Sequence, residues 1–411
     1  MAAQQRLGSG TYGTVVSPAL QNTIDGVATN FPGNVTKVYY EQSAYDDAVS
    51  KIPLISTVMG ENAGHRMNRY TKKYTGKNLK DKLHITNTDP LFYISNTDPL
   101  YILRMPNLGK DFSSVNTYVD IVRATPLMTI FEQILKLFNQ TNTLKTSGYI
   151  HGDIRESNIM FNPRDGTMTI IDFDYLQPID IFDDKYGENY GFYSNPPESI
   201  IIRNLLAIKK PSHIWKIKTE EWSEQQFRSF NNFYKATGVS DESKLRDDIK
   251  IINEENTKYI EEVAHMDPTD AAKRVMLPTF DSYGLAITLL EFLIVVYTPR
   301  VFADELSTRT IDQLRSELVS IGVTKRGVAY TAAELNTYAK ALLSIVNTVL
   351  RPMALGYARN RIDIGEGLRR AQEIMTELQR DLAASTSAGG ARRTHRSRRN
   401  RRNKPRRTAR R

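Results

Sequence analysis

The sequence contains no cysteine, and this absence excludes disulfide bonds and thiolate metal sites. Such a chain is typical of a reducing compartment, and a hydrophobic core must hold it together. With 411 residues and 40% hydrophobic content, the chain is long enough to bury a large core. Its 25% charged residues are ordinary for a globular protein. The composition therefore predicts a folded protein without covalent cross-links.

Two membrane-related patterns are also missing. Residues 1–10, MAAQQRLGSG, have neither the basic nor the apolar region of a signal peptide. The longest apolar run, LAITLLEFLIVVY at 285–297, is short for a membrane span and contains Glu291. We therefore expect a buried helix in this run, no membrane partner, and a cytoplasmic or nuclear location.

Acidic residues are absent from the last stretch of the chain. Residues 392–411 contain eleven Arg and one Lys, and without those twelve cations the chain has 43 basic and 46 acidic residues, a net charge of −3. The net charge of +9 therefore belongs to the tail. We expect residues 383–411 to form a disordered Arg-rich tail. Residues 392–411 could bind nucleic acid or another polyanion, or act as a nuclear-import signal.

The pattern of apolar residues changes along the chain. The first hundred residues favour short strands around 7–20 and 34–40, with one helix over 43–58. The near-repeats NTDPLFYIS (87–95) and NTDPLYILR (96–104) each place a turn signal before an apolar strand, which predicts a hairpin. Beyond residue 112 the spacing is helical, with helices predicted over 125–147, 219–238, 240–263, 330–350 and 366–382. The sequence thus predicts an α+β fold with a β-rich region over residues 1–104, a helical region over residues 105–382, and the tail.

A glycine-rich stretch lies near the N-terminus, between two predicted strands. It reads LGSGTYGTV, and its candidate residues are Gly8, Ser9, Gly10, Thr11, Gly13 and Val15. Glycines let a backbone approach phosphate oxygens closely, but the same pattern also fits a plain hairpin. A strand follows it where a dinucleotide-binding fold would have a helix.

Three further stretches carry polar residues beside apolar ones. Lys37 lies in the strand NVTKVYY, where an inward-facing lysine needs an anion. HGDIRESN places Asp153 five residues before Asn158, so that a carboxylate and a carboxamide share one loop. Asp172 ends the apolar strand TIID and could join Asn158 as an oxygen ligand of a hard cation. His151 reads as a structural hydrogen-bonding residue, not as a general base.

Together these motifs resemble the eukaryotic-type Ser/Thr protein kinases in order and approximate spacing. Further elements match: NPPE at 195–198 resembles the Ala-Pro-Glu element, DSYG at 281–284 the start of the central helix, and Arg361 the arginine that pairs with that glutamate. YILRMPNLG at 101–109 resembles the strand that leads into the adenine-binding hinge. The resemblance covers about residues 6–375. It implies a bilobal kinase-like fold, with a small β-rich N-lobe, a large helical C-lobe and a helical insertion over 199–280.

The resemblance also implies ATP and Mg²⁺ as cofactors, with Mn²⁺ as a substitute, and protein substrates phosphorylated on Ser or Thr. Asp153 would accept the substrate hydroxyl's proton, Asn158 and Asp172 would bind the metal, and Arg155 would stand where Ser/Thr kinases have a lysine near the γ-phosphate. The residues implied at the nucleotide are Gly8, Ser9, Gly10, Thr11, Gly13, Val15, Lys37, Met105, Asn107 and Leu108.

The chain departs from the kinase pattern in several places. Kinases pair the strand lysine with a glutamate on the first helix, but the helix here offers only Asp46 and Asp47, of which we favour Asp47. Gly152 replaces the arginine of the catalytic loop, and Asp174 replaces the glycine that follows Asp-Phe. Glu198 and Asp281 are separated by 82 residues, far more than kinases usually have.

Two other interpretations remain open. Small-molecule kinases of the aminoglycoside and choline type share His-Gly-Asp and Ile-Asp-Phe, but generally lack the Pro-Glu element and the Asp-x-Tyr helix start. The chain could also be a catalytically weak kinase-like module that tethers nucleic acid through its tail. The motif set, insertion and Arg-rich end resemble divergent kinases of large DNA viruses, some of which are packaged in virions.

Overall fold

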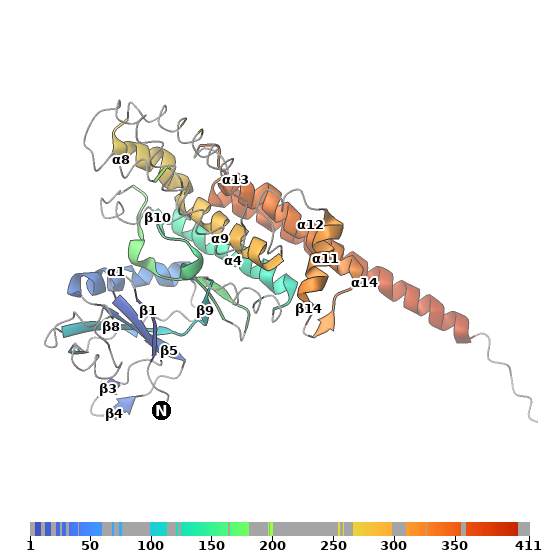
Figure 1. Cartoon of the computed structure of the whole chain (residues 1–411), viewed down its shortest axis with the longest axis horizontal. Coiled ribbons are helices and arrows are strands. Elements are labelled where there is room, and N and C mark those ends of the chain that lie inside the picture. The colour runs from blue at the N-terminus through green and yellow to red at the C-terminus, as the bar shows by residue number, and fades with distance from the viewer. Residues whose placement is uncertain are drawn as a thin grey trace, which may run out of the picture.

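A computed structural model describes a large share of the chain (Figure 1). The described residues are 5–9, 13–17, 22–24, 27–29, 33–39, 41–59, 68–69, 74–75, 99–112, 121, 125–162, 165–180, 196, 198–199, 254, 258, 266–297, 310–325, 327–354 and 359–401. Gly10 and Thr11, the first copy of the near-repeat, and nearly all of the helical hairpin predicted over 219–263 lie outside them.

The N-terminal region of the chain forms an antiparallel sheet. Its strand order is β1-β2-β5-β8-β6, and β7 also pairs with β8. The repeated apolar and β-branched residues of these segments explain why they pair as strands. The strands are β1 (Gln5–Ser9), β2 (Gly13–Ser17), β5 (Asn34–Tyr39), β6 (Asn68–Arg69), β7 (Tyr74–Thr75) and β8 (Pro99–Pro106), and β3 (Asn22–Ile24) pairs with β4 (Val27–Thr29) in a separate hairpin.

Helix α1 (Gln42–Met59) packs against this sheet and also reaches the helical region. Tyr39 and Leu103 of the sheet are buried together with Ala48 of the helix. The helix predicted over 43–58 is therefore confirmed, and its apolar face is the one that the sheet covers. Figure 1 shows α1 between the sheet and the remaining helices.

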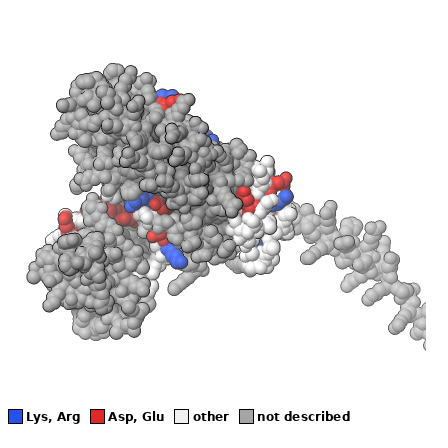
Figure 2. Space-filling view, in the orientation of Figure 1, with Lys and Arg blue, Asp and Glu red and all other residues white. Residues whose placement is uncertain are grey.

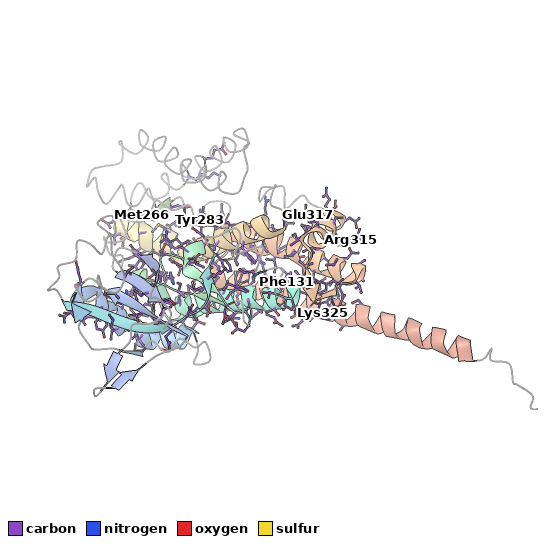
Figure 3. All side chains as sticks on the ribbon, turned by 60° about the horizontal axis from the view of Figure 1, so that its bottom comes forward. Phe131, Met266, Tyr283, Arg315, Glu317 and Lys325 are labelled. Atoms are coloured by element: carbon purple, nitrogen blue, oxygen red, sulfur yellow. The ribbon has the colours of Figure 1, made fainter. Side chains whose placement is uncertain are left out.

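The helical region has its core around α4 (Leu127–Thr146), which contacts α9 (Phe280–Tyr297) and α14 (Ile364–Arg401). Phe131, labelled in Figure 3, is one of the buried side chains of α4. Gly148 adopts a φ of 81° directly after this helix, as its predicted stop requires. The other helical elements are α8 (Pro268–Ala271), η7 (Ala272–Met276), η8 (Leu277–Thr279), α11 (Ile311–Ile321), α12 (Ala332–Ile345), η9 (Val346–Leu350) and α13 (Arg351–Ala354).

Several short strands pair with one another outside the main sheet. β11 (Ile159–Phe161) pairs with both β12 (Met168–Ile170) and β9 (Lys110–Asp111). Gly109, which leads into β9, has a φ of 106°, and a Cβ there would collide with the backbone carbonyl of Phe161. Only glycine fits this close approach. β10 (Tyr149–Ile150) pairs with β13 (Gln177–Pro178), and β14 (Thr324–Lys325) pairs with β15 (Val328–Ala329).

The α+β class predicted from the sequence is confirmed: the described residues are mostly helical, with small antiparallel sheets. The apolar run at 285–297 lies in α9, and most of its described side chains are buried. Among the described residues no helix is long and apolar enough to cross a membrane. The predicted boundary between residues 104 and 105 falls inside strand β8.

Helix α14 is longer than the sequence predicts. Disorder is expected from residue 383, but α14 continues to Arg401, and Figure 1 shows its end projecting away from the other elements. Alanine and arginine are good helix formers, and the first half of α14 is anchored by packing on α4 and α12. The structure thus describes helix over 383–401 where the sequence predicts disorder, whereas 402–411 lie outside the described residues.

Candidate active site

Lys37 lies in the middle of the sheet, on the face that α1 covers. Its cross-strand neighbours are Val15 of β2 and Leu103 of β8. Residues directly opposite each other in an antiparallel pair place their side chains on the same face. Met105 lies on this face too, because it pairs with Val35, two residues before Lys37. Lys37 is thus surrounded by apolar side chains and needs anionic partners.

Two carboxylates supply them. The Nζ atom of Lys37 donates to Asp172 Oδ1 at 2.9 Å and to Asp174 Oδ2 at 2.8 Å. Burial alone would lower the pKa of Lys37, but these two carboxylates outweigh it and raise the pKa above its usual value. Lys37 therefore stays charged and joins the sheet to the segment after β12.

This result corrects the predicted partner of Lys37. Asp47, the acid favoured from the sequence, accepts a hydrogen bond from Lys51 at 2.6 Å, four residues along α1. Lys51 also donates to the backbone carbonyl of Asp174 at 2.9 Å. Lys51, and not Asp47, is thus the residue of α1 that meets the Asp174 turn. The one indication of this contact in the sequence is the spacing of Lys51, which follows Ala48 by three positions and therefore lies on the same side of the helix as that buried residue.

The backbone around Asp172 is unusual. Asp172 has a φ of 65°, the only positive value among the described non-glycine residues. Asp174, which stands where the kinase pattern has glycine, does not share this left-handed conformation. Asp174 instead lies in the short 3-10 helix η4 (Phe173–Tyr175), which Asp172 precedes. Aspartate is one of the residues that tolerate this left-handed region. The turn aims both carboxylates at Lys37.

Asp153 and Asn158 touch directly. Asn158 Nδ2 donates to Asp153 Oδ2 at 2.7 Å and to the Asp153 carbonyl at 2.8 Å. The 3-10 helix η3 (Glu156–Asn158) closes the loop, so five residues bring the two side chains together. The amide of Ile171 donates to the Asn158 carbonyl at 2.8 Å, and this bond places Asn158 beside the segment that contains Asp172.

Burial raises the pKa of Asp153 to about 7, and the neighbouring Arg155 guanidinium opposes that shift. Arg155 Nε lies 3.3 Å from Asp153 Oδ1. The negative charge of Asp172 also contributes to the raised pKa of Asp153. A carboxylate with a pKa near neutrality can accept and release a proton at physiological pH.

No protein-family model matches the chain, and no curated protein matches it.

The loop before Asp153 is anchored by Asp281, the second residue of α9. Its carboxylate accepts hydrogen bonds from the backbone amides of His151 at 2.6 Å and Gly152 at 3.0 Å. Gly152 adopts a φ of 79°, a conformation that glycine tolerates best. A buried carboxylate that accepts two backbone amides is a strong, charge-assisted anchor. It holds Asp153 in one position.

His151 has no free nitrogen for proton transfer. Nε2 lies 3.0 Å from the Ile171 carbonyl, and Nδ1 accepts the amide of Asp153 at 3.3 Å. Burial lowers the pKa of His151 to about 4, so the ring is neutral at physiological pH. Its ring also packs against Phe173, with centroids 4.8 Å apart. The histidine therefore connects the two loops, and this is a structural hydrogen-bonding role of the kind that the sequence predicts.

Glu198 and Arg361 form a buried ion pair. Two hydrogen bonds of 3.0 and 2.9 Å join them, and the side chains are only 2% and 1% exposed. The guanidinium also lies 4.8 Å from the ring centroid of Tyr283, which is labelled in Figure 3. Residues 163 positions apart in the sequence thus meet beside α9.

Those of the remaining candidate residues that the structure describes lie in or next to the strands of the sheet. Gly8 and Ser9 lie in β1, opposite Val15 and Thr14 of β2. Asn107 follows β8, and its amide donates to the Gly33 carbonyl at 2.8 Å. The structure places Gly13 in β2, and Met105 and Leu108 are half-buried.

The structure describes no cluster of three or more His, Cys, Asp or Glu side chains that could hold a metal ion by themselves. Asn158 and Asp172 nevertheless suit a shared oxygen site. The amide nitrogen of Asn158 is held by Asp153, and its oxygen, which accepts a long 3.5 Å hydrogen bond from Ser157, keeps a second lone pair for a ligand. The Asp172 side chain is 38% exposed, and Mg²⁺ usually needs only one or two protein ligands beside phosphates and water.

Charged side chains of both signs meet on the surface of the described residues. Figure 2 shows acidic and basic atoms next to each other in the middle of the visible face.

Proposed function

We propose that the chain is a Mg·ATP-dependent protein kinase that transfers the γ-phosphoryl group to Ser or Thr hydroxyls. In this proposal the sheet and α1 form the small lobe of a kinase-like fold, and the helices around α4 form the large one. The proposal rests on one observation above all: the amide of Ile171, the residue before Asp172, donates to the carbonyl of Asn158, so the Asp153–Asn158 pair lies beside the segment that holds the Lys37–Asp172 ion pair. Lys37 and Asp172 are 135 positions apart in the sequence, whereas Asp153 and Asn158 belong to one loop.

Proton transfer would be the task of Asp153. Its carboxylate would orient the substrate hydroxyl and accept its proton as the oxygen attacks the γ-phosphorus and the bond to the β-phosphate oxygen breaks. Asn158 keeps Oδ2 of Asp153 in place, and Asp281 keeps the loop in place. Most of the remaining catalysis would come from positioning and from stabilising charge.

The nucleotide would lie against the sheet face that carries Lys37. Lys37 would contact the α- and β-phosphates, Val15 and Met105 would contact adenine, and the strands around Gly8 and Gly13 would cover the phosphates. Asn158 and Asp172 would hold Mg²⁺ or Mn²⁺, which neutralises phosphate charge when bound. Arg155 would lie near the γ-phosphate, where its planar guanidinium suits phosphate oxygens.

The Glu198–Arg361 pair favours a protein substrate over a small one. This pair and the Asp281 anchor correspond to the two elements that aminoglycoside- and choline-type kinases generally lack. The tight, buried geometry of both contacts supports the presence of a kinase-like activation segment. Small-molecule phosphotransfer remains the alternative that the assay must separate.

Transfer of labelled γ-phosphate from ATP tests the proposal. The acceptors are a basic protein, an acidic protein, and a panel of small alcohols and amines, each with Mg²⁺. We expect labelled Ser and Thr in a protein acceptor, and no label when Asp153→Asn replaces the wild type. Label only on small acceptors would establish the small-molecule alternative. No transfer and no Mg·ATP binding would leave a kinase-like tether as the better interpretation.

The pH profile provides a more specific prediction. Because the pKa of Asp153 is raised to about 7, kcat/KM should fall about tenfold for each pH unit below that value as the base becomes protonated. Arg155 opposes the shift, so Arg155→Met should raise the pKa of Asp153 and move the acid limb to higher pH. An acid limb that stays in place in Arg155→Met would show that another group titrates.

The Arg-rich tail would add a second activity, binding of nucleic acid or another polyanion. Its twelve cations over 392–411 support this role. Residues 392–401 of this stretch belong to the continuous helix α14. Twelve cations that each replaced a counterion would give a log–log salt slope of about −11 on duplex DNA. We therefore expect binding of a labelled duplex to weaken steeply with salt and to vanish when 392–411 are deleted. Equal affinity of the truncated and full chains would exclude the tail as the binding element.

A further inference from the structure

The acid that holds Lys37 comes from an unexpected place. The kinase pattern supplies it from the first helix, yet α1 contains only Asp46 and Asp47 as acids. Asp46 is exposed, and Asp47 binds Lys51. Among the described residues the carboxylates that reach Lys37 belong to Asp172 and Asp174.

These two carboxylates are not equivalent. Asp172 is the more exposed, with 38% of its side chain accessible against 15% for Asp174. In the proposed function Asp172 would also hold the metal, so its carboxylate would be shared between that cation and Lys37. Asp174 has no such second task, and its 2.8 Å contact is the shorter of the two. Asp174 would therefore keep its contact with Lys37 if Asp172 held the metal.

Asp174 is itself fixed by α1. The ammonium group of Lys51 donates to the Asp174 carbonyl at 2.9 Å and is held on its other side by Asp47 at 2.6 Å. Only 15% of the Lys51 side chain is exposed. An ammonium carries three donors, so one group can join the helix acid and the turn carbonyl at once. α1 and η4 are in contact at this point.

We propose that Asp174 positions Lys37 for the nucleotide, in place of the missing helix glutamate, and that Lys51 ties α1 to the Asp174 turn. This inference rests on the proposed function. It makes Asp174 and Lys51 positioning residues: neither contacts the reacting atoms, and both act through Lys37. In the kinase pattern the helix supplies the acid that holds the strand lysine. Here that acid, Asp174, lies on the turn, and the helix supplies Lys51, which binds the turn.

A double-mutant cycle in kcat/KM for ATP tests the first half. Asp174→Asn removes the charge without changing the shape, and we expect a loss of about tenfold or more. In a Lys37→Met background the same change should cost less than about twofold, because its effect passes through Lys37. Asp46→Asn, the same change at an exposed site on α1, is the matched control and should leave kcat/KM unchanged. Equal losses from Asp174→Asn in both backgrounds, or no loss in either, would overturn the assignment.

Lys51→Met tests the second half, with Lys51→Arg as the conservative variant. We expect Lys51→Met to lower kcat/KM, and Lys51→Arg, which keeps the charge and donors, to recover part of the loss. A merely packing role would be served equally well by methionine. Wild-type activity in Lys51→Met would therefore sink this half.

A third measurement separates this inference from the proposed function. Urea unfolding midpoints need no nucleotide, and Lys37→Met and Asp174→Asn should shift them non-additively, whereas Lys37→Met and Asp46→Asn should add. If the wild type neither binds Mg·ATP nor transfers phosphate but the midpoints are non-additive, the proposed kinase function is refuted. The coupling of Lys37 with Asp174 then still stands. Activity in the wild type with additive midpoints and additive kinetics would refute the inference but keep the kinase.

Discussion

Asp153→Asn is expected to lower kcat by a factor of about 10²–10⁴ while leaving the fold intact. The change is isosteric, so the loop between Asp281 and Asn158 has no reason to move. What disappears is the proton acceptor, and the attacking hydroxyl then has no base within the site. Asn158 and Lys37 are untouched, so Mg·ATP should still bind. The loss should therefore appear in kcat far more than in the KM for ATP.

Steady-state transfer kinetics with a protein acceptor would measure this effect, with a urea unfolding curve to confirm the fold. The same substitution at the exposed Asp46 provides the control for handling and for loss of one charge. A second check comes from pH: the acid limb near pH 7 should be lost with the group that causes it. Wild-type kcat in Asp153→Asn would remove the main support for a phosphotransferase.

Arg361→Met is expected to lower the free energy of unfolding by about 3–5 kcal/mol. Both members of the ion pair are almost fully buried, and removal of the guanidinium takes two hydrogen bonds and a compensating charge from the buried Glu198 carboxylate. The cation–π contact with Tyr283 is lost as well. Most of this loss of stability comes from the buried Glu198 carboxylate once Arg361 is removed. Addition of Glu198→Leu to the Arg361→Met variant should therefore recover much of the lost free energy of unfolding.

Chemical unfolding, followed by circular dichroism, would measure this loss. Arg369 on α14 is a suitable control, because its pairs with Glu366 and Glu373 are exposed and Arg369→Met should leave the midpoint nearly unchanged. If Arg361→Met were as stable as wild type, or if the Glu198→Leu variant added a second full penalty, the two residues would not act as a pair.

Local features of the site could be read from the sequence. Asp153 and Asn158 are five residues apart, and a loop that short has few ways to keep them separate. The strands around Lys37 and the helices α1, α4 and α12 follow from the spacing of apolar residues. His151 was correctly expected to be structural, since its neighbours are backbone groups of the same two loops.

Long-range partners could be predicted only where a resemblance pointed to them. The pairing of Glu198 with Arg361, 163 residues away, came from matched motifs, and no spacing rule would have found it. Where the chain departs from the pattern, the prediction of Asp47 as the partner of Lys37 was wrong. Asp47 lies on the correct helix, but the rotation of α1 against the sheet turns Lys51 toward the Asp174 turn and leaves Asp47 to pair with Lys51.

Residues 383–401 show that composition alone can also underestimate regular structure. Composition alone predicted disorder from residue 383, yet composition counts neither the anchoring of α14 on α4 and α12 nor the cooperativity that lets an anchored helix extend.

The sequence by itself determined the α+β class, the separation of a slightly acidic body from a basic end, and the local pairing of Asp153 with Asn158. Tertiary structure alone decided which acid holds Lys37 and which lysine meets Asp174. The physical reason is that a side chain's charge is fixed by its residue type, whereas its partner depends on how a helix is rotated when its apolar face is buried.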